Sequence, residues 1–184
     1  MRQKGLSEIN DQHLAFIEKQ KMFFVATAAP EGRVNMAPKE ADALRVLGPN
    51  RIVWLNFTGA ENETAAHHLE QPRMTIMWCS FDAKPVILRV YGKATITHPR
   101  DEGWDQLAAL FPPTPGSRQI LDLSIDLVLT SCGFGVPLYD FVGPRDTLRR
   151  WAEQKGADGL NDHWSVYNQT SIDGKPTIRS SVTR

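Results

Sequence analysis

VILRVYGKATI, residues 86–96, carries the clearest hydrophobic alternation in the chain. One face would hold Val86, Leu88, Val90, Ala94 and Ile96, and the other Ile87, Arg89, Tyr91, Lys93 and Thr95. A period of two indicates a β-strand with one buried face. Gly92 interrupts the alternation, and its missing side chain would let another backbone or a flat ligand come close.

Strand-like segments continue on both sides of this one. Six strands are predicted, over residues 22–29, 34–40, 51–57, 73–81, 86–96 and 120–132. In the last of them every second residue from Leu121 to Leu129 is apolar, which predicts one continuous buried face. Turn sequences such as Pro30-Glu31-Gly32 separate several strands. Strands joined mostly by short turns favour an antiparallel barrel over a parallel α/β sheet.

Helical patterns are short and lie between or after the strands. They cover residues 11–20, with Asp11 as the expected N-cap, then 62–71, 101–111, 145–155 and 158–167. Gly156 would end the fourth helix. This predicts a mainly β fold with helices, made of a split β-barrel domain over residues 1–132. Residues 133–184 would form a helical extension that packs on the barrel or on a dimer partner.

Composition excludes several classes of function. The 184 residues hold 21 acidic and 21 basic side chains, so no global charge favours nucleic acid or an anionic membrane. No apolar run approaches the roughly 20 residues that span a bilayer, and the first residues lack the apolar centre of a signal peptide. Cys79 and Cys132 are expected to be free, buried thiols. We therefore expect a cytoplasmic protein with no nucleic-acid or membrane partner.

The segment WLNFTGAENETAAHHLEQP, residues 54–72, is the first candidate site. A strand leads into a helix that starts near Asn62, and a helix start offers free N–H groups to a phosphate. Asn62 and Thr64 would add side-chain donors. The alternative is that Asn62 only caps its own helix. Glu61 and Glu63 favour this alternative, because acids stabilise a helix start and would repel a phosphate.

Two cations are further candidates. Lys39, at the end of its strand, suits a phosphate as a point charge, although a solvated surface lysine is the commoner case. Arg89 lies on the strand face opposite the core and would meet solvent, a partner subunit or a ligand. No phosphate-binding P-loop, GxGxxG or GxSxG motif is present. The five histidines are too scattered to predict a metal site.

These segments, taken in order, resemble the pyridoxamine 5'-phosphate oxidase-like family of FMN-binding split-barrel proteins. The resemblance rests on FFVATAAPEGRVNMAPKE, VWLNFTGAENETAAHHLEQPRMTIMWCSF and VILRVYGKATI. The segment CGFGVPLYDFVGPRDTLRRWAEQKG, followed by SIDGKP, is similar to a subgroup with a helical C-terminal extension.

The resemblance implies a six-stranded split barrel and a homodimer with one FMN in each of two interface clefts. By position, Lys39, Asn62 and Thr64 would hold the FMN phosphate. Asn56, Phe57 and Thr58 would line the flavin ring. Arg89 would lie on the strand that passes the dimer cleft. No catalytic side chain is identified from the sequence, which is expected, because hydride transfer to a flavin requires no side-chain acid or base.

Several positions depart from the family pattern. Glu63 and Thr64 replace the Arg-Lys pair of the true oxidases, and Val34 replaces an arginine. Less positive charge implies weaker FMN binding, and vitamin B6 oxidase activity is not expected. An FMN-dependent oxidoreductase is the leading hypothesis. The alternatives are a non-catalytic protein that holds a flavin or another planar cofactor, and a structural homodimer without a cofactor.

Overall fold

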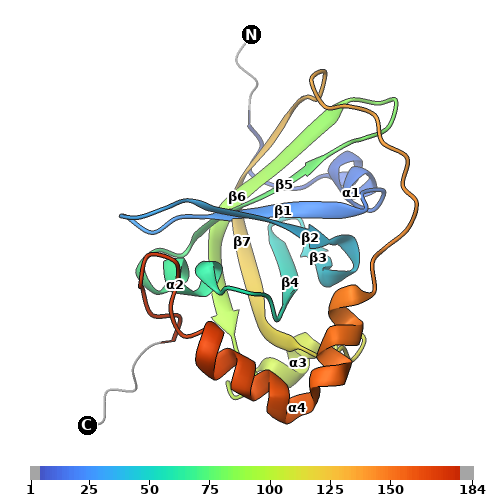
Figure 1. Ribbon diagram of the computed structural model, residues 1–184. Coiled ribbons are helices and arrows are strands. Elements are labelled where there is room, and N and C mark those ends of the chain that lie inside the picture. Colours follow the sequence, from blue (N-terminus) through green and yellow to red (C-terminus); the bar gives the residue numbers. More distant parts are fainter. Residues whose placement is uncertain (1–4, 179–184) are drawn as a thin grey trace.

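The computed structural model describes residues 5–178, in which one antiparallel sheet curls into a half-barrel (Figure 1). The strand order is β2-β1-β5-β6-β7-β4-β3. Their bounds are β1 Met22–Thr27, β2 Asn35–Glu40, β3 Leu44–Gly48, β4 Arg51–Phe57, β5 Arg73–Cys79, β6 Val86–Thr97 and β7 Ser117–Cys132. The predicted mixed fold built on an antiparallel split barrel is confirmed.

The sheet has seven strands rather than the six predicted. The additional strand, β3, forms a hairpin with β4 across the Pro49-Asn50 turn. Its five residues lack a regular alternation of buried and exposed side chains. The period of two that reveals a half-buried strand is therefore absent from this segment.

Aromatic side chains fill the inside of the curled sheet. Phe23, Trp54 and Trp78 come from three different strands, and Phe23 has its ring centre 6.1 Å from Trp54 and 6.3 Å from Trp78. All three are at most 2% exposed. Aromatic pairs at such separations add to the free energy gained from burial. This core fixes which face of each strand points inward.

The long strands β6 and β7 contain a β-bulge that sequence alternation did not predict. Gly92 pairs with Ile125 and Tyr91 pairs with Leu127, so Asp126 has no partner on β6. The extra residue reverses the alternation of β7, so Val128 is buried while Leu127 is 40% exposed. The prediction that Leu127 and Leu129 share the face of Leu121 is therefore wrong.

Helices lie around the half-barrel. Their bounds are α1 Asp11–Ile17, α2 Glu63–Glu70, α3 Trp104–Ala108 and α4 Thr147–Tyr167. Asn10, not Asp11, caps α1: its side chain accepts from the His13 amide, and the His13 ring accepts from the Asn10 amide. This reciprocal arrangement satisfies two amides that a cap at Asp11 would leave free.

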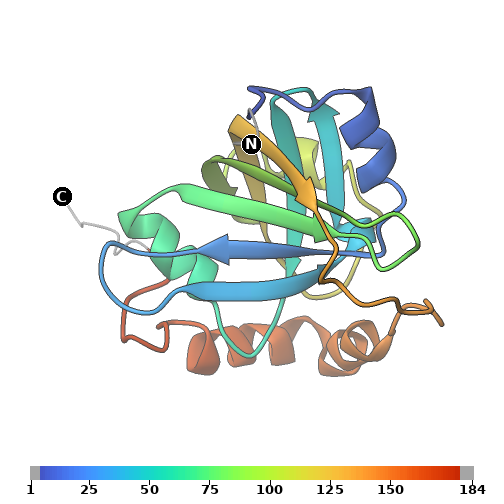
Figure 2. The same ribbon diagram turned by 90° about the horizontal axis from the view of Figure 1, so that it is seen from above.

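The predicted C-terminal extension follows β7. Residues 133–146 connect β7 to α4, which lies along one side of the barrel in both views (Figures 1 and 2). Gly156 (φ 65°, ψ 178°) kinks α4 at the predicted break. Residues 179–184 of the predicted extension, and residues 1–4, lie outside the described residues. None of the helices within residues 5–178 is long and apolar enough to cross a membrane.

The two cysteines are free, but they are not buried as predicted. Cys132 is exposed and Cys79 is half-buried. Cys79 faces away from the core, because its neighbour Trp78 is buried, and Cys132 is the last residue of β7. An apolar sequence neighbourhood alone does not reveal either position.

Candidate functional site

A β-bulge in β7 directs two consecutive polar side chains toward the same region. Asn56 on β4 pairs with Gln119 and Phe57 pairs with Ser117, so Arg118 has no partner on β4. Bulges of this kind redirect side chains that would otherwise alternate between faces. Arg118 is 7% exposed and Gln119 is 0% exposed. The bulge therefore places a buried guanidinium and a buried amide side by side.

Both side chains bind the segment that leads into α2. Arg118 Nη1 donates to the carbonyl oxygen of Glu61 at 3.0 Å, and Gln119 Nε2 donates to Asn62 Oδ1 at 3.1 Å. Asn62 occupies the N-cap position, but its side chain makes no capping hydrogen bond. The alternative in which Asn62 only caps its own helix is therefore wrong, because its side chain bonds to β7 instead.

Lys39 approaches this region from β2. It shares the inner face of the sheet with Phe23, its partner on β1. Its Nζ donates to Asn56 Oδ1 at 3.3 Å and lies 5.5 Å from the centre of the Trp54 ring. Burial lowers the pKa of Lys39 to about 8, and the positive charge of Arg118 contributes to the shift. Lys39 is thus a half-buried cation rather than a solvated surface lysine.

Thr64 lies in the first turn of α2 and is also buried. Its hydroxyl accepts a hydrogen bond from Asn35 Nδ2 at 3.4 Å, and Asn35 lies on β2, the strand of Lys39. The structure therefore brings four of the predicted residues to one region, where β2, β4 and the start of α2 meet. We refer to Lys39, Asn56, Asn62, Thr64, Arg118 and Gln119 as the polar cluster.

The acidic residues at the start of α2 bind elsewhere. Glu63 Oε1 accepts from the amide of Ile172 at 2.7 Å, and Glu63 Oε2 lies 4.0 Å from His67 Nε2. Glu61 has an exposed side chain and presents its carbonyl oxygen to Arg118. We expected these acids to repel a phosphate. Their positions do not support this, because the Glu63 carboxylate binds the backbone at Ile172 in the C-terminal segment.

The end of α4 closes one side of the polar cluster. Asn168 is buried; its Oδ1 accepts from Arg118 Nη1 at 2.5 Å, and its Nδ2 donates to the carbonyl oxygens of Gly59 and Ala60. Trp164 Nε1 donates to Thr58 Oγ1 at 2.8 Å. Thr58 therefore supports the loop before α2 and contacts the extension with its side chain.

Phe57 and Arg89 lie outside the polar cluster. Phe57 is half-buried and packs against the hydrophobic core. Arg89 lies on the outer face of the sheet, because its neighbours Leu88 and Val90 are buried in the core. Arg89 Nη1 donates to Ser131 Oγ at 3.0 Å. Within one chain, Arg89 and Lys39 are therefore on opposite faces of the sheet.

The electrostatics of the polar cluster are those of an anion site. Burial lowers the pKa of Arg118 to about 10. Among the ion pairs within residues 5–178, none involves Lys39 or Arg118. Arg118 Nε and Gln119 Oε1 are buried, and neither finds a hydrogen-bond partner in the part of the chain that the structure describes. One buried and one half-buried cation beside a helix start, neither with an ion-pair partner within residues 5–178, suit a phosphate group, so these residues fit the phosphate of an FMN.

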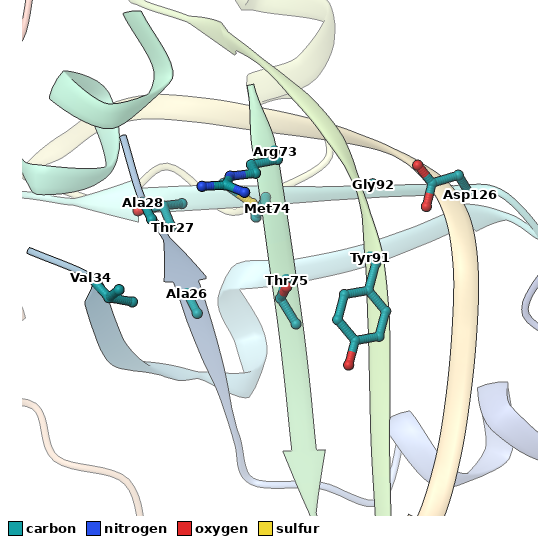
Figure 3. Close-up of a pocket in the computed structure, with 10 residues that line it drawn as sticks. All are labelled: Ala26, Thr27, Ala28, Val34, Arg73, Met74, Thr75, Tyr91, Gly92 and Asp126. Atoms are coloured by element: carbon teal, nitrogen blue, oxygen red, sulfur yellow. The ribbon is translucent and has the colours of Figure 1, made fainter. Parts of the chain in front are cut away.

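A separate open depression lies on the outer face, near the last residues of β1 and the first residues of β5 (Figure 3). Its volume is about 470 Å³. Cross-strand neighbours Ala26, Thr75 and Tyr91 form its floor, with Val34 and Asp126 at opposite sides. None of the predicted site residues lines it. Within residues 5–178, no group of three His, Cys, Asp or Glu side chains is placed to hold a metal ion.

Arg118, Gln119 and Asn168 were not predicted as site residues. The signal for the first two is a pair of consecutive polar residues at the start of an apolar strand, in SRQIL at 117–121. A regular strand would place only one of them inside. Asn168 carries no comparable signal, since it is one of several polar residues at the end of a helix.

Comparisons with known proteins agree with this architecture. Residues 9–132 match the family model described as pyridoxamine 5'-phosphate oxidase. The pyridoxamine 5'-phosphate oxidase family protein ustO of Aspergillus flavus is 33% identical over an alignment of 183 residues. The alignment covers 89% of this chain and 73% of that protein.

Solved structures share the fold at low identity. One is a protein of Lactobacillus delbrueckii provisionally assigned as a pyridoxamine 5'-phosphate oxidase, with a TM-score of 0.55, 18% identity, and 67% and 95% of the two chains covered. Another is a variant of HupZ from Group A Streptococcus, with a TM-score of 0.54, 15% identity, and 67% and 99% covered. The fold, the family model and the curated relative agree, and the chain belongs to the pyridoxamine 5'-phosphate oxidase family.

Proposed function

We propose that this protein binds FMN as a homodimer and acts as an FMN-dependent oxidoreductase. The observation that supports this most directly is the polar cluster, where buried Arg118 and half-buried Lys39 lie beside the start of α2 without an ion-pair partner among residues 5–178. Membership of the pyridoxamine 5'-phosphate oxidase family supports the same proposal.

Lys39, Asn62 and Thr64 would hold the phosphate, with Lys39 as the charged donor. Asn56, Phe57 and Thr58 follow in sequence on β4 and the loop after it, and would lie along the flavin ring. A bound FMN would supply the redox chemistry, and the protein would bind it, orient it and restrict water. Since Lys39 is half-buried, its ammonium would interact with a phosphate more strongly than a solvated lysine does.

The proposed homodimer uses the outer face of the sheet. Half-exposed and exposed apolar side chains follow one another across its strands, among them Met36, Phe24, Met77, Ile87 and Leu129. A contiguous apolar face of this kind is typical of an interface, and a two-fold dimer is the commonest way to cover it. Arg89 and the depression of Figure 3 lie on this same face.

A reducing compartment is proposed as well. Cys79 and Cys132 are free thiols, and neither is buried. Accessible free thiols persist in the cytoplasm, where disulfides are rare.

The decisive experiment is a titration of the purified protein with FMN, followed by the quenching of flavin fluorescence. We expect quenching in the wild type and loss of affinity in a Lys39→Ala, Thr64→Ala double variant. Reduction of the bound flavin by NADH or NADPH, measured by absorbance under anaerobic conditions, then tests turnover. Binding without reduction would favour a non-catalytic flavin carrier, and the absence of binding would favour a structural homodimer.

A further inference from the structure

Arg118 is the one buried arginine of the polar cluster, and no negatively charged group within residues 5–178 forms an ion pair with it. Nη1 donates to two neutral oxygens, the carbonyl of Glu61 and Oδ1 of Asn168. Nε is buried and has no hydrogen-bond partner among residues 5–178. A buried guanidinium that bonds only to neutral acceptors keeps its full positive charge in a region of low dielectric. Such an arrangement is costly unless an anion binds there.

The surroundings of Arg118 show where an anion would lie. Its charge acts on Lys39, whose pKa it helps to lower. It bonds to the residue two positions before α2, and its neighbour Gln119 bonds to Asn62 at the helix start. Gln119 Oε1 is also unpartnered. Lys39 on β2 and Arg118 on β7 repel one another, and one phosphate that contacts both would stabilise both charges.

We propose that Arg118 is the second cation of the phosphate site, acting together with Lys39, and that the C-terminal extension completes the site by holding Arg118 through Asn168. This assignment rests on the proposed flavin function. It gives Arg118 a role in ligand affinity beyond its bonds to the loop before α2. It also explains how a site with Thr64 in place of a basic residue retains two positive charges.

Riboflavin provides the discriminating ligand, because it has the ring of FMN and lacks the phosphate. We would measure the Kd of FMN and of riboflavin for the wild type and for Arg118→Gln, which removes the charge and keeps an amide. Removal of a charged hydrogen bond corresponds to a loss of about 10- to 100-fold in affinity. We expect that loss for FMN and a change of less than about 2-fold for riboflavin. Arg150→Gln, at an exposed arginine of α4, is the matched control.

Asn168→Asp is a second variant that preserves side-chain shape. It would place a carboxylate against Arg118 Nη1, where the Asn168 amide oxygen now lies, and so offset the positive charge of the guanidinium. It would also remove the Nδ2 donor to Gly59 and Ala60. We expect FMN to bind more weakly while riboflavin binding is retained. Arg118→Lys, which keeps the charge, should restore part of the FMN affinity that Arg118→Gln loses. These variants test the assignment even if Arg118→Gln does not fold.

The outcomes separate the two proposals. An equal loss for FMN and riboflavin in both variants would mean that Arg118 is only structural and would overturn the assignment. Unchanged FMN affinity in folded Arg118→Gln would do the same. If the wild type binds neither flavin, the proposed function fails. The anion site is then tested with inorganic phosphate, which should raise the Tm of the wild type and not that of Asn168→Asp.

Discussion

Lys39 carries a charge that lowers the stability of the protein without ligand and that we propose to be used in binding. Its ammonium contacts an amide oxygen and an aromatic ring, and no acidic side chain within residues 5–178 forms an ion pair with it. The folded-state pKa of about 8 lies below the ordinary value of 10.5. Between these two pH values the unfolded chain binds more protons, so the free energy of unfolding rises with pH there. Below pH 8 the folded protein carries the full free-energy cost of holding a charged Lys39 away from water.

Replacing Lys39 with methionine should therefore stabilise the protein without ligand. At pH 7 we expect the free energy of unfolding to rise by about 1–2 kcal/mol, because an unpaired, partly buried charge is replaced by an apolar side chain of similar size. Urea unfolding followed by tryptophan fluorescence measures this. The gain should shrink as the pH rises from about 8 to 10.5, because the wild type recovers this free energy over that range. Lys155→Met, at an exposed lysine of α4, should show no gain.

FMN affinity should depend on pH through the same residue. As the pH rises from about 7 to 9, Lys39 of the free protein loses its proton. FMN binding then requires the uptake of a proton by Lys39, which lowers the affinity. The Kd should increase by up to about tenfold per pH unit above pH 8. Riboflavin affinity should stay flat over this range, and so should FMN affinity in Lys39→Met. A flat FMN profile in the wild type would contradict contact between Lys39 and the phosphate.

At the scale of elements, the two β-bulges of β7 decide which side chains face inward. The bulge at Asp126 reverses the alternation of buried and exposed side chains in the C-terminal part of β7. The bulge at Arg118 brings two polar residues to the polar cluster. The first depends on Gly92. A Cβ at this position would lie 2.0 Å from the carbonyl oxygen of Ser124. The close approach that sequence suggested at Gly92 is therefore made by the backbone of the neighbouring strand.

Gly92→Ala should consequently destabilise the barrel. Backbone atoms of β7 occupy the space that the methyl group needs, so the two longest strands would have to separate. We expect a loss of about 2–4 kcal/mol in the free energy of unfolding, measured in urea. Gly135→Ala is the control, since no atom lies within 4 Å of a Cβ placed there. A Gly92→Ala variant of wild-type stability would show that the bulge is not constrained.

The junction of α4 and the loop before α2 offers another test at this scale. Asn168→Ala leaves the buried Arg118 without its side-chain partner and frees the carbonyl oxygens of Gly59 and Ala60. We expect a loss of about 1–3 kcal/mol in urea unfolding, the usual cost of unsatisfied buried polar groups. Asn161→Ala, at an exposed position of the same helix, should cost little. Equal effects of the two variants would mean that Asn168 does not anchor the extension.

At the scale of the whole molecule, the sheet separates two surfaces. The polar cluster lies where its inner face meets α2 and α4, while the apolar outer face carries Arg89 and the depression of Figure 3. Interfaces that form stable dimers are usually apolar at their centre. A homodimer through the outer face would bury the depression and leave α4 outside the interface.

A charge on the outer face should therefore prevent dimerisation. Met36→Glu changes an exposed apolar residue of β2, which is 65% exposed in the single chain. We expect light scattering at micromolar concentration to give the mass of a dimer for the wild type and of a monomer for this variant. Val166→Glu, at a 68% exposed position of α4, should remain dimeric. A monomeric wild type would exclude the proposed dimer.

The sequence determined the class of fold and the places of six strands, and its resemblance to a known family pointed to four residues of the polar cluster. Local patterns were sufficient for the fold class and the strands, because alternation and turn residues are features of neighbouring positions. The seventh strand, the bulges, Arg118 and Asn168 required the tertiary structure. A bulge depends on the register between strands far apart in the chain, and Asn168 meets Arg118 across 50 residues. Which side chains share a buried site is set by that packing, since only the folded chain removes water from both partners.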